Sequence, residues 1–439
     1  MVPCRTVFCF TLGLATLSGG LRGSLAALQD IVNSPGPCKR NYCLNATELI
    51  RRFGYPLEVH SHVRTEDRYL LTLLRIPGGR GTCGSARPGP PVLLQHGLLD
   101  SASTFLVNEP GESLAYLLAD AGFDVWLGNA RGNDYSLGHE VLTPSEPDFW
   151  AFSFDEHARY DLPAMVDYVL ARANEGWNDT TAFSRLGYVG HSQGTMMMFF
   201  ALSTLGPSFA AKVAHFSALA PVTRIANMRS VLFDALAKLD VDTMFRLFGV
   251  SRFLAFPPWL KTISGGACGE FPPACEDVIF LACGRGSPPN LNRTRFDVYT
   301  YNTPAGTSVR NIAHFGQLFR RGWMRRFDFG SEALNVAHYG QAVPPAYDLQ
   351  SIERVPMTLF TGSRDALADP TDVAWLRAQL AESGRFAPGD VSWVAVEGYQ
   401  HLDFTWGVDA KDRIYPTILA SLRRAKYRAA DVQIQPAFV

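Results

Sequence analysis

The sequence predicts an α/β protein, with a mostly parallel β-sheet flanked by helices and a mainly helical segment inserted into it. Short, nearly continuous apolar runs recur along the chain, as expected of strands that are buried on both faces. Helix-length segments, such as 113–121 and 162–173, separate most of these runs. This alternation is typical of a parallel sheet covered by helices on both sides. The runs expected to form strands are 91–95, 123–127, 186–189, 213–219, 357–361 and 391–396.

The sheet is expected to begin with an antiparallel hairpin, because the runs 57–64 and 69–76 flank a short polar turn. The alternation of strands and helices fails between 223 and 349, where Phe, Pro, Gly, Arg and Cys are frequent. We interpret 223–349 as a cap or lid inserted between two parts of the core, 27–222 and 350–439.

The composition indicates a globular protein without a strong charge preference. Hydrophobic residues make up 47% of the chain and charged residues 18%, which argues against intrinsic disorder. The 40 basic and 41 acidic side chains give a formal net charge of -1, so there is no surplus of positive charge to attract nucleic acid or an anionic membrane. Any affinity for lipid would therefore be hydrophobic.

The segment 1–26 is expected to be a secretory signal peptide. Arg5 precedes the apolar run 7–17, small residues follow, and Ser24 and Ala26 offer a cleavage edge. A membrane anchor is the alternative, but the run is shorter than the roughly 20 apolar residues of a spanning helix, and no later run reaches that length. The sequence therefore predicts a protein of the secretory pathway with no transmembrane anchor.

The glycosylation sequons and the cysteines are consistent with a protein of the secretory pathway. N-glycosylation acceptors are expected at Asn45, Asn178 and Asn292. Of the 8 cysteines, those outside the signal peptide form an even set in an oxidising compartment, where disulfides are expected. Close neighbours are easily bridged, whereas a metal site is disfavoured because no CxxC spacing occurs. The favoured pairs are Cys38 with Cys43 and Cys268 with Cys275, which leaves Cys83 and Cys283 as candidate free thiols.

A GxSxG motif, Gly-His-Ser-Gln-Gly, occupies 190–194 between the strand 186–189 and a helix expected from 193 to about 205. A sharp strand-to-helix turn exposes the serine hydroxyl, and the glycines let strand and helix approach closely. The helix N-terminus favours an anion at the reacting centre. Ser192 is therefore the candidate nucleophile of an α/β-hydrolase fold, and the methionines at 196–198 are expected to pack in the core.

The nucleophile needs a general base, and the base needs a carboxylate that orients it. In this fold the chain order is nucleophile, acid, base. His401 follows the last expected strand, and Asp365 follows the strand 357–361, at the edge where such sheets build sites. Asp369 and Asp372 are rivals for the acid, but they fall at an expected helix start, which gives them a structural role.

Leu98 and Gln193 are the candidate residues of an oxyanion hole. The backbone amide of Gln193 directly follows the nucleophile, and Leu98 lies in the loop after the strand 91–95. Two such N–H donors are what a tetrahedral oxyanion requires. Gly97 gives the loop the freedom to point its amide inward.

Several longer motifs lead to a family. They are LQHGLL at 94–99, ADAGFDVWLGN at 119–129, RGN at 131–133, FWAFSFDE at 149–156, YDLPA at 160–164, PAGTSV at 304–309 and HLDF at 401–404. With these motifs the chain resembles the acid lipase family, which includes the gastric and lysosomal acid lipases. The resemblance runs from about residue 50 to the C-terminal helix, while 37–43 and 78–89 depart from the family pattern.

The resemblance implies an α/β-hydrolase core with a cap and lid, no cofactor and no metal. It implies hydrolysis of triacylglycerols or sterol esters at a lipid–water interface, and a secreted or lysosomal destination. It also implies the triad of Ser192, Asp365 and His401, with Leu98 and Gln193 in the oxyanion hole. The acidic pair at 155–156 is expected to be structural rather than catalytic.

Two alternatives are weighed against a lipase. A small-ester or thioester hydrolase of the same fold would be favoured by a short cap, and this cap is long. A catalytically silent binding protein would be expected to lose the nucleophile or the base, and both are present. In the apolar stretch 231–260, most side chains are expected to form the core of the cap, and a minority to line the acyl pocket or face outward on a lid.

Overall fold

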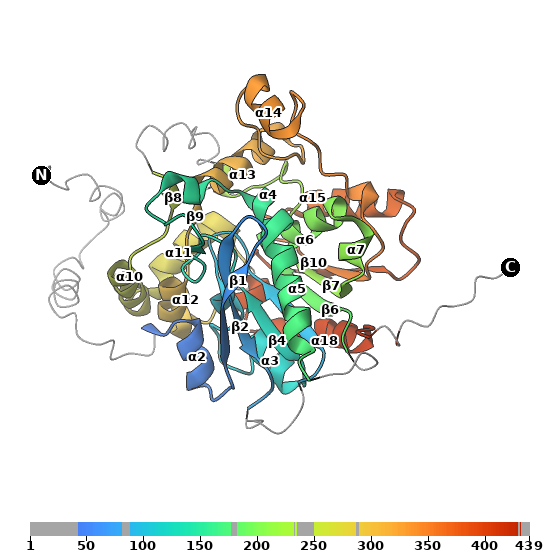
Figure 1. The fold of residues 1–439 in the computed structure, drawn as a ribbon. Coiled ribbons are helices and arrows are strands. Elements are labelled where there is room, and N and C mark those ends of the chain that lie inside the picture. The colour runs from blue at the N-terminus through green and yellow to red at the C-terminus, as the bar shows by residue number, and fades with distance from the viewer. Residues whose placement is uncertain are drawn as a thin grey trace, which may run out of the picture.

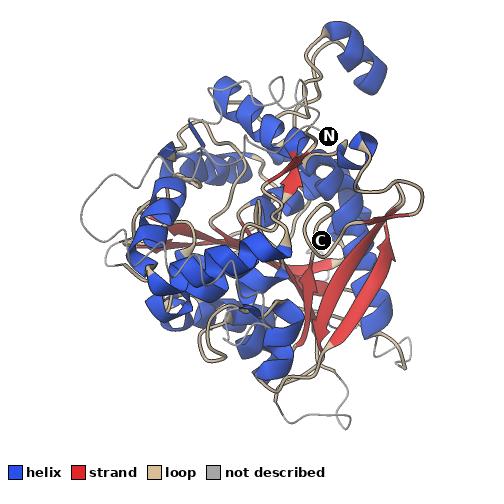
Figure 2. Ribbon diagram, turned by 90° about the vertical axis from the view of Figure 1, so that its left-hand side faces the viewer, coloured by secondary structure: helices blue, strands red, loops and turns tan. Residues whose placement is uncertain are grey.

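The computed structural model describes residues 43–80, 88–176, 182–231, 233–234, 250–286, 289–428 and 431. Several predicted features lie outside these residues: the signal peptide, the sequon at Asn178, Cys38, Cys83, and residues 235–249 of the expected lid. Within them, helices pack on both sides of a central β-sheet (Figures 1 and 2). None of the described helices is long and apolar enough to cross a membrane.

The central sheet has the strand order β1-β2-β4-β3-β6-β7-β10-β11, with the short β5 paired to β2. β1 and β2 form the expected antiparallel hairpin, β2 is also antiparallel to β4, and the strands from β4 to β11 run parallel. The expected α/β class with a mostly parallel sheet is thus confirmed. The strands are β1 Glu58–Arg64, β2 Tyr69–Ile76, β3 Pro91–Gln95, β4 Asp124–Gly128, β5 Gly138–His139, β6 Leu186–His191, β7 Val213–Leu219, β10 Met357–Gly362 and β11 Val391–Val396.

The strands at the centre of the sheet, β3, β6, β7 and β10, are buried along their whole length. The apolar runs located them well because both faces of each strand pack against helices. The expectation of burial on both faces is wrong for β11, which is the edge strand and is mostly half-buried or exposed. Its Trp393 is 46% exposed. Apolar content alone does not distinguish an edge strand from a central one.

The helices of the core follow the expected alternation. The side chains of Met196, Met197 and Met198 in α6 are fully buried, which confirms their expected place in the core. The core helices are α2 Ala46–Arg52, α3 Leu114–Asp120, α4 Phe154–Glu156, α5 Leu162–Ala173, α6 Gln193–Thr204, α7 Gly206–Ala210, α15 Pro370–Glu382, α16 Asp403–Trp406, α17 Ala410–Arg413 and α18 Tyr415–Arg424.

Between β7 and β10 the described chain is mainly helical, and α14 projects from the top of the molecule in Figure 1. The sequence did not predict the short antiparallel pair of β8 Arg252–Phe253 with β9 Thr307–Ser308. A disulfide between Cys268 and Cys275 joins α10 to α11, and Cys43 is also disulfide-bonded. The helices are α10 Pro258–Glu270, α11 Pro272–Cys283, α12 Phe296–Asn302, α13 Val309–Arg321 and α14 Glu332–Tyr339.

Buried polar contacts join this helical segment to the core. Asp155 accepts hydrogen bonds from the Phe327 N–H, at 2.9 Å, and from the Tyr347 hydroxyl. Glu156 accepts from the backbone N–H of Ser153 at 2.7 Å and so closes the N-terminal cap of α4. The carboxylates at 155–156 are thus fully engaged in holding elements together.

Candidate active site

Ser192 occupies the turn between β6 and α6. Its backbone has φ 53° and ψ -119°, a conformation that is strained for a residue with a side chain. A Cβ atom added to Gly194 would lie 2.4 Å from the Gln95 carbonyl oxygen, so only glycine lets the start of α6 pass so close to the end of β3. The strained turn holds the Ser192 hydroxyl at the end of the sheet, as the GxSxG motif predicted.

Asp365 and His401 are joined by hydrogen bonds in loops that follow adjacent strands. His401 Nδ1 lies 2.9 Å from Asp365 Oδ2 and 3.0 Å from Oδ1. Asp365 is fully buried, and its Oδ1 also accepts from the N–H groups of Leu367, at 2.9 Å, and Ala368, at 2.8 Å. The loops can meet because Gly362 ends β10 without a side chain: a Cβ there would lie 2.5 Å from the Tyr399 carbonyl oxygen.

The hydrogen bond at Nδ1 decides which ring nitrogen of His401 can act as a base. A carboxylate accepts, so Nδ1 carries the proton and Nε2 keeps its lone pair. His401 Nε2 is buried and has no hydrogen-bond partner among the described residues. A free basic nitrogen of this kind is what a serine nucleophile requires.

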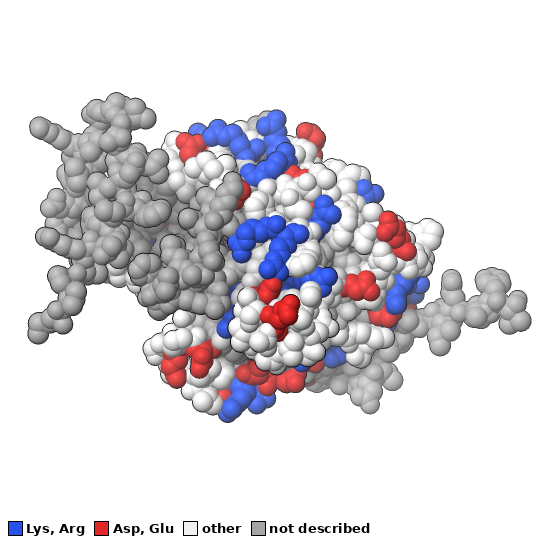
Figure 3. All heavy atoms as spheres, turned by 90° about the horizontal axis from the view of Figure 1, so that it is seen from above, with Lys and Arg blue, Asp and Glu red and all other residues white. Residues whose placement is uncertain are grey.

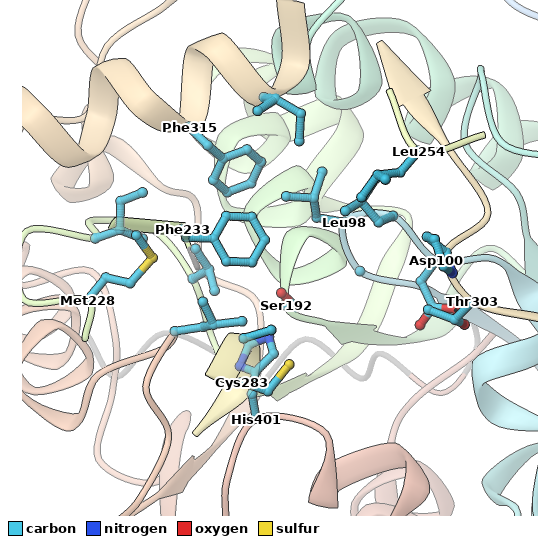
Figure 4. A pocket seen from close by; sticks show the side chains of 18 of the residues that line it. Leu98, Asp100, Ser192, Met228, Phe233, Leu254, Cys283, Thr303, Phe315 and His401 are labelled. Carbon is cyan, nitrogen blue, oxygen red and sulfur yellow. Dashed lines mark hydrogen bonds between the residues drawn. The ribbon is translucent and has the colours of Figure 1, made fainter. Parts of the chain in front are cut away.

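Ser192, His401 and Leu98 line one cavity with a volume of about 920 Å³ (Figure 4). In Figure 4, His401 lies next to Ser192, and Leu98 lies on the other side of the serine. Most of the lining is apolar and comes from both the core and the segment between β7 and β10. The apolar side chains of this lining include Val222, Ile225, Met228, Phe233, Leu254, Phe256, Ile279, Ile312, Phe315 and Phe319.

Two further histidines flank the site and are held neutral by burial. Burial lowers the pKa of His191 to about 3 and that of His96 to about 4. His191 Nε2 lies 3.0 Å from the carbonyl oxygen of His401, to which it donates. His96 donates from Nδ1 to the Gly97 carbonyl at 2.8 Å and accepts at Nε2 from the Ala130 N–H at 3.1 Å. Both rings thus fix the backbone around the site without adding charge.

Gln193 lies at the first position of α6, directly after Ser192, and it does not belong to the cavity lining. Its Oε1 accepts from Asn311 Nδ2 of α13 at 2.8 Å, and its Nε2 lies 3.2 Å from Nδ1 of His157. Burial, aided by the charge of Arg131, lowers the pKa of His157 well below its ordinary value, so its ring is neutral and Nδ1 can accept. Helix α13, in the segment between β7 and β10, therefore holds the side chain of the residue that directly follows Ser192.

The rival acids are engaged elsewhere. Asp369 accepts from the Thr371 N–H at 2.8 Å as the N-cap of α15 and pairs with Arg229 at 2.8 Å. Asp372, in the first turn of α15, accepts from Arg224 at 3.1 Å and from the Asn227 N–H at 2.8 Å. Neither carboxylate contacts His401 among the described contacts.

Two features of the site were not predicted from the sequence: the contact of Asn311 with Gln193, and the position of Cys283 in the cavity lining. Asn311 lies 118 residues from Gln193 in the chain, so no local pattern could connect them. Cys283, at the end of α11, was a candidate free thiol and is one, and it lines the cavity beside His401 (Figure 4). Burial raises the pKa of its thiol, so the group is neutral. In the described part of the chain no cluster of His, Cys, Asp or Glu could hold a metal ion.

Comparison with known proteins identifies the fold family of the chain. Residues 46–109 match the family model described as a partial alpha/beta-hydrolase lipase region, and residues 90–408 match the alpha/beta hydrolase fold. A Sulfolobus solfataricus protein described as a candidate lipase shares the fold alone, with a TM-score of 0.53 and 13% identity over 81% of this chain and 89% of that one. The chain is thus an α/β hydrolase.

Curated relatives narrow this class. Lipase member K of Homo sapiens is 40% identical over 86% of this chain and 90% of that protein. Lysosomal acid lipase/cholesteryl ester hydrolase of Homo sapiens is 39% identical over 87% and 91%, and gastric triacylglycerol lipase of Rattus norvegicus is 37% identical over 92% and 96%. The chain belongs to the acid lipase family and is a carboxylic ester hydrolase.

Proposed function

We propose that this hydrolase is a lipase that cleaves the ester bonds of neutral lipids, triacylglycerols or sterol esters, through Ser192, His401 and Asp365. One observation carries the proposal. His401, bound by Asp365 and with Nε2 free, lines the same large and mainly apolar cavity as Ser192.

In the proposed reaction, His401 Nε2 takes the proton of Ser192 as Oγ attacks the ester carbonyl carbon. The Asp365 carboxylate keeps the ring in the required tautomer and stabilises the imidazolium. The backbone N–H groups of Leu98 and Gln193 are assigned to the oxyanion. His401 then gives its proton to the departing alcohol, and water releases the acyl group from Ser192 by the same steps.

The substrate class is inferred from the cavity and the relatives. A volume of about 920 Å³ is at the upper end of the roughly 300–1,000 Å³ found for ligand sites, which suits a long acyl chain. The relatives' names include cholesteryl ester and triacylglycerol substrates. The face that carries α14 mixes basic, acidic and uncharged side chains, and neither sign covers it (Figure 3). Contact with a lipid surface would therefore be hydrophobic rather than electrostatic.

The proposal includes the organisation of the chain. We assign 223–349 to a cap between the core parts 27–222 and 350–439, after a signal peptide at 1–26, and infer a secreted or lysosomal destination. Among the described contacts, the side chains of Asn45 and Asn292 are engaged only through Oδ1, which accepts capping hydrogen bonds, so Nδ2 of each is available to carry a glycan. Peptide mapping before and after glycosidase treatment tests these two sites and Asn178.

A substrate panel tests the function. Hydrolysis rates of emulsified triolein, cholesteryl oleate and propyl butanoate are compared across acid and neutral pH, alongside labelling by a fluorophosphonate probe. We expect turnover of at least one long-chain lipid ester and probe labelling that Ser192→Ala abolishes. Turnover of propyl butanoate alone would indicate a small-ester hydrolase. Folded protein without labelling at Ser192 would indicate a silent binding protein.

A further inference from the structure

The cavity beside Ser192 has two chemically different ends (Figure 4). In the view of Figure 4, Met228, Phe233 and Phe315 lie on one side of Ser192 and form an apolar end. Asp100 and Thr303 lie on the opposite side, next to each other. An acyl chain needs only the first kind of surface, so the second kind calls for a separate chemical reason.

The polar end is built from three elements. Asp100 lies in the loop after β3, and Thr303 directly follows α12. The Thr303 hydroxyl donates to Asp100 Oδ1 at 3.1 Å. The backbone N–H of Ser101 donates to the same oxygen at 2.8 Å. Thr300 of α12 and Ser264 of α10 also line the cavity, and the Ser264 hydroxyl lies 3.1 Å from the Thr300 carbonyl oxygen. The loop after β3 and the helices α10 and α12 thus all contribute oxygen-bearing side chains to the cavity lining.

Asp100 is the unusual one among these oxygen-bearing side chains. It is 4% exposed, and burial raises the pKa of its carboxyl to about 6. Among the described residues only hydrogen-bond donors, from Ser101, Thr104 and Thr303, oppose this effect, and no cation does. A buried carboxyl without a cation costs stability, and such groups are found preferentially at functional sites.

We propose that Asp100 and Thr303 form a subsite that binds a free hydroxyl group of the ester substrate. A substrate hydroxyl can donate to a remaining lone pair of the Asp100 carboxylate, beside the hydrogen bond from Thr303, whereas an alkyl group in this place would only desolvate the carboxylate. The hydroxyl belongs to the alcohol part of the ester, as in a partial glyceride, or to the far end of the acyl chain. This inference rests on the proposed ester hydrolysis at Ser192 and adds a preference among esters.

Matched pairs of esters test the subsite. Hydroxyethyl butanoate and propyl butanoate differ only by a hydroxyl in place of a methyl on the alcohol side. Propyl ω-hydroxyhexanoate and propyl heptanoate differ in the same way on the acyl side. We expect kcat/KM of the wild type to favour the hydroxyl-bearing member of one pair by roughly tenfold, the size of a buried hydrogen bond to a charged group. The pair that shows the preference identifies which part of the ester the subsite binds.

Two variants link the preference to these residues. Asp100→Leu removes the carboxyl at similar volume and should bring the ratio of the preferred pair close to unity. Thr303→Val is nearly isosteric and should lower the ratio less, and it keeps the test decisive if Asp100→Leu fails to fold. Thr371→Val changes an exposed threonine of α15 that does not belong to the cavity lining, so it serves as the matched control and should keep the wild-type ratio.

The ratio separates this inference from the proposed function, because turnover of propyl butanoate reports the triad alone. A wild-type ratio near unity for both pairs would overturn the subsite even though the esters are hydrolysed. So would a preference that persists in folded Asp100→Leu and in Thr303→Val. Equal losses on both members of each pair would instead show that Asp100 only supports the loop that carries Leu98.

Discussion

The core buries its apolar side chains, whereas the segment between β7 and β10 leaves several large apolar side chains exposed. In the core, the strands at the centre of the sheet are buried throughout, and Asp365 beside them is fully buried. On α10, α11 and the residue that joins them, by contrast, large apolar side chains are exposed: Trp259 is 64% exposed, and Phe271 and Leu281 are each 53% exposed. The core fixes reacting groups by excluding water, while these helices offer apolar surface to the outside. The difference suggests that chemistry and contact with a lipid phase are assigned to different parts of the chain.

The largest expected effect lies in the core. Asp365→Asn should lower kcat by about ten thousandfold, because the amide no longer fixes the required tautomer of His401. Asp369→Asn is the matched control: it removes the ion pair with Arg229, while the Asn side-chain oxygen can still cap α15, so it should lower the melting temperature slightly and leave kcat close to the wild type. Esterase kinetics with thermal unfolding of both variants check this. The reverse pattern would assign the acid to Asp369.

A second prediction concerns pH and the contact between the two regions. His314 of α13 lies 3.1 Å from Ser153 Oγ of the core and donates from Nε2 to the Arg325 carbonyl at 2.9 Å. Burial lowers its pKa from 6.5 to about 3, although the Arg325 carbonyl and Glu156 oppose the shift. Below pH 6.5 the unfolded state therefore binds more protons at this position than the folded state. The contribution of the neutral His314 ring to stability is fully present above pH 6.5 and is lost as the pH falls below it.

The linked measurement is urea unfolding of the wild type and His314→Gln, whose side chain does not titrate. The free energy of unfolding of the wild type, relative to that of the variant, should fall by about 2 kcal/mol between pH 7.5 and pH 5. This value follows from a loss of about 1.36 kcal/mol for each pH unit below 6.5. If the difference in free energy of unfolding between the two proteins stayed constant over this range, His314 would not be held in its neutral form by burial.

A third prediction concerns the hydrogen bond between Asn311 of α13 and Gln193 of the core. Asn311→Ala leaves Gln193 Oε1 without its 2.8 Å partner, so the amide that follows Ser192 should lose its fixed position. We expect kcat on a soluble ester to fall about tenfold with little change in KM, since the oxyanion is stabilised mainly in the transition state. Asn335→Ala removes hydrogen bonds within the cap only and should leave kcat unchanged. An Asn311 variant with normal kcat would mean that the core holds Gln193 unaided.

The smallest expected effect is a selective one on the exposed surface. Replacing Trp259 and Leu281 together by Ser should lower hydrolysis of emulsified triolein several-fold and leave propyl butanoate turnover nearly unchanged, because neither side chain lines the cavity. Trp393→Ser on edge strand β11 removes a comparable exposed indole from the core and is the control. Equal losses on both substrates would show that α10 and α11 are a structural cover.

The core could be predicted from the sequence much further than the cap. Buried strands such as β3 and β7 appear as apolar runs with the observed bounds, and the GxSxG motif locates Ser192 between β6 and α6. The exposure of β11 was missed because a strand's position in the sheet depends on its neighbours rather than its own residues. Asn311 and Asp100 were missed for a related reason, since their partners Gln193 and Thr303 lie 118 and 203 residues away.

The buried contacts between α13 and the core have a consequence for engineering. A chimera that took its cap from another acid lipase would have to receive more than a surface that fits. The transferred cap would also need a side chain that binds Gln193 as Asn311 does and one that binds Ser153 as His314 does. Without them, these polar side chains of the recipient core would lose their hydrogen-bond partners in the cap. Substrate range could therefore be exchanged between such enzymes only in blocks that carry α13 together with the lining of the cavity.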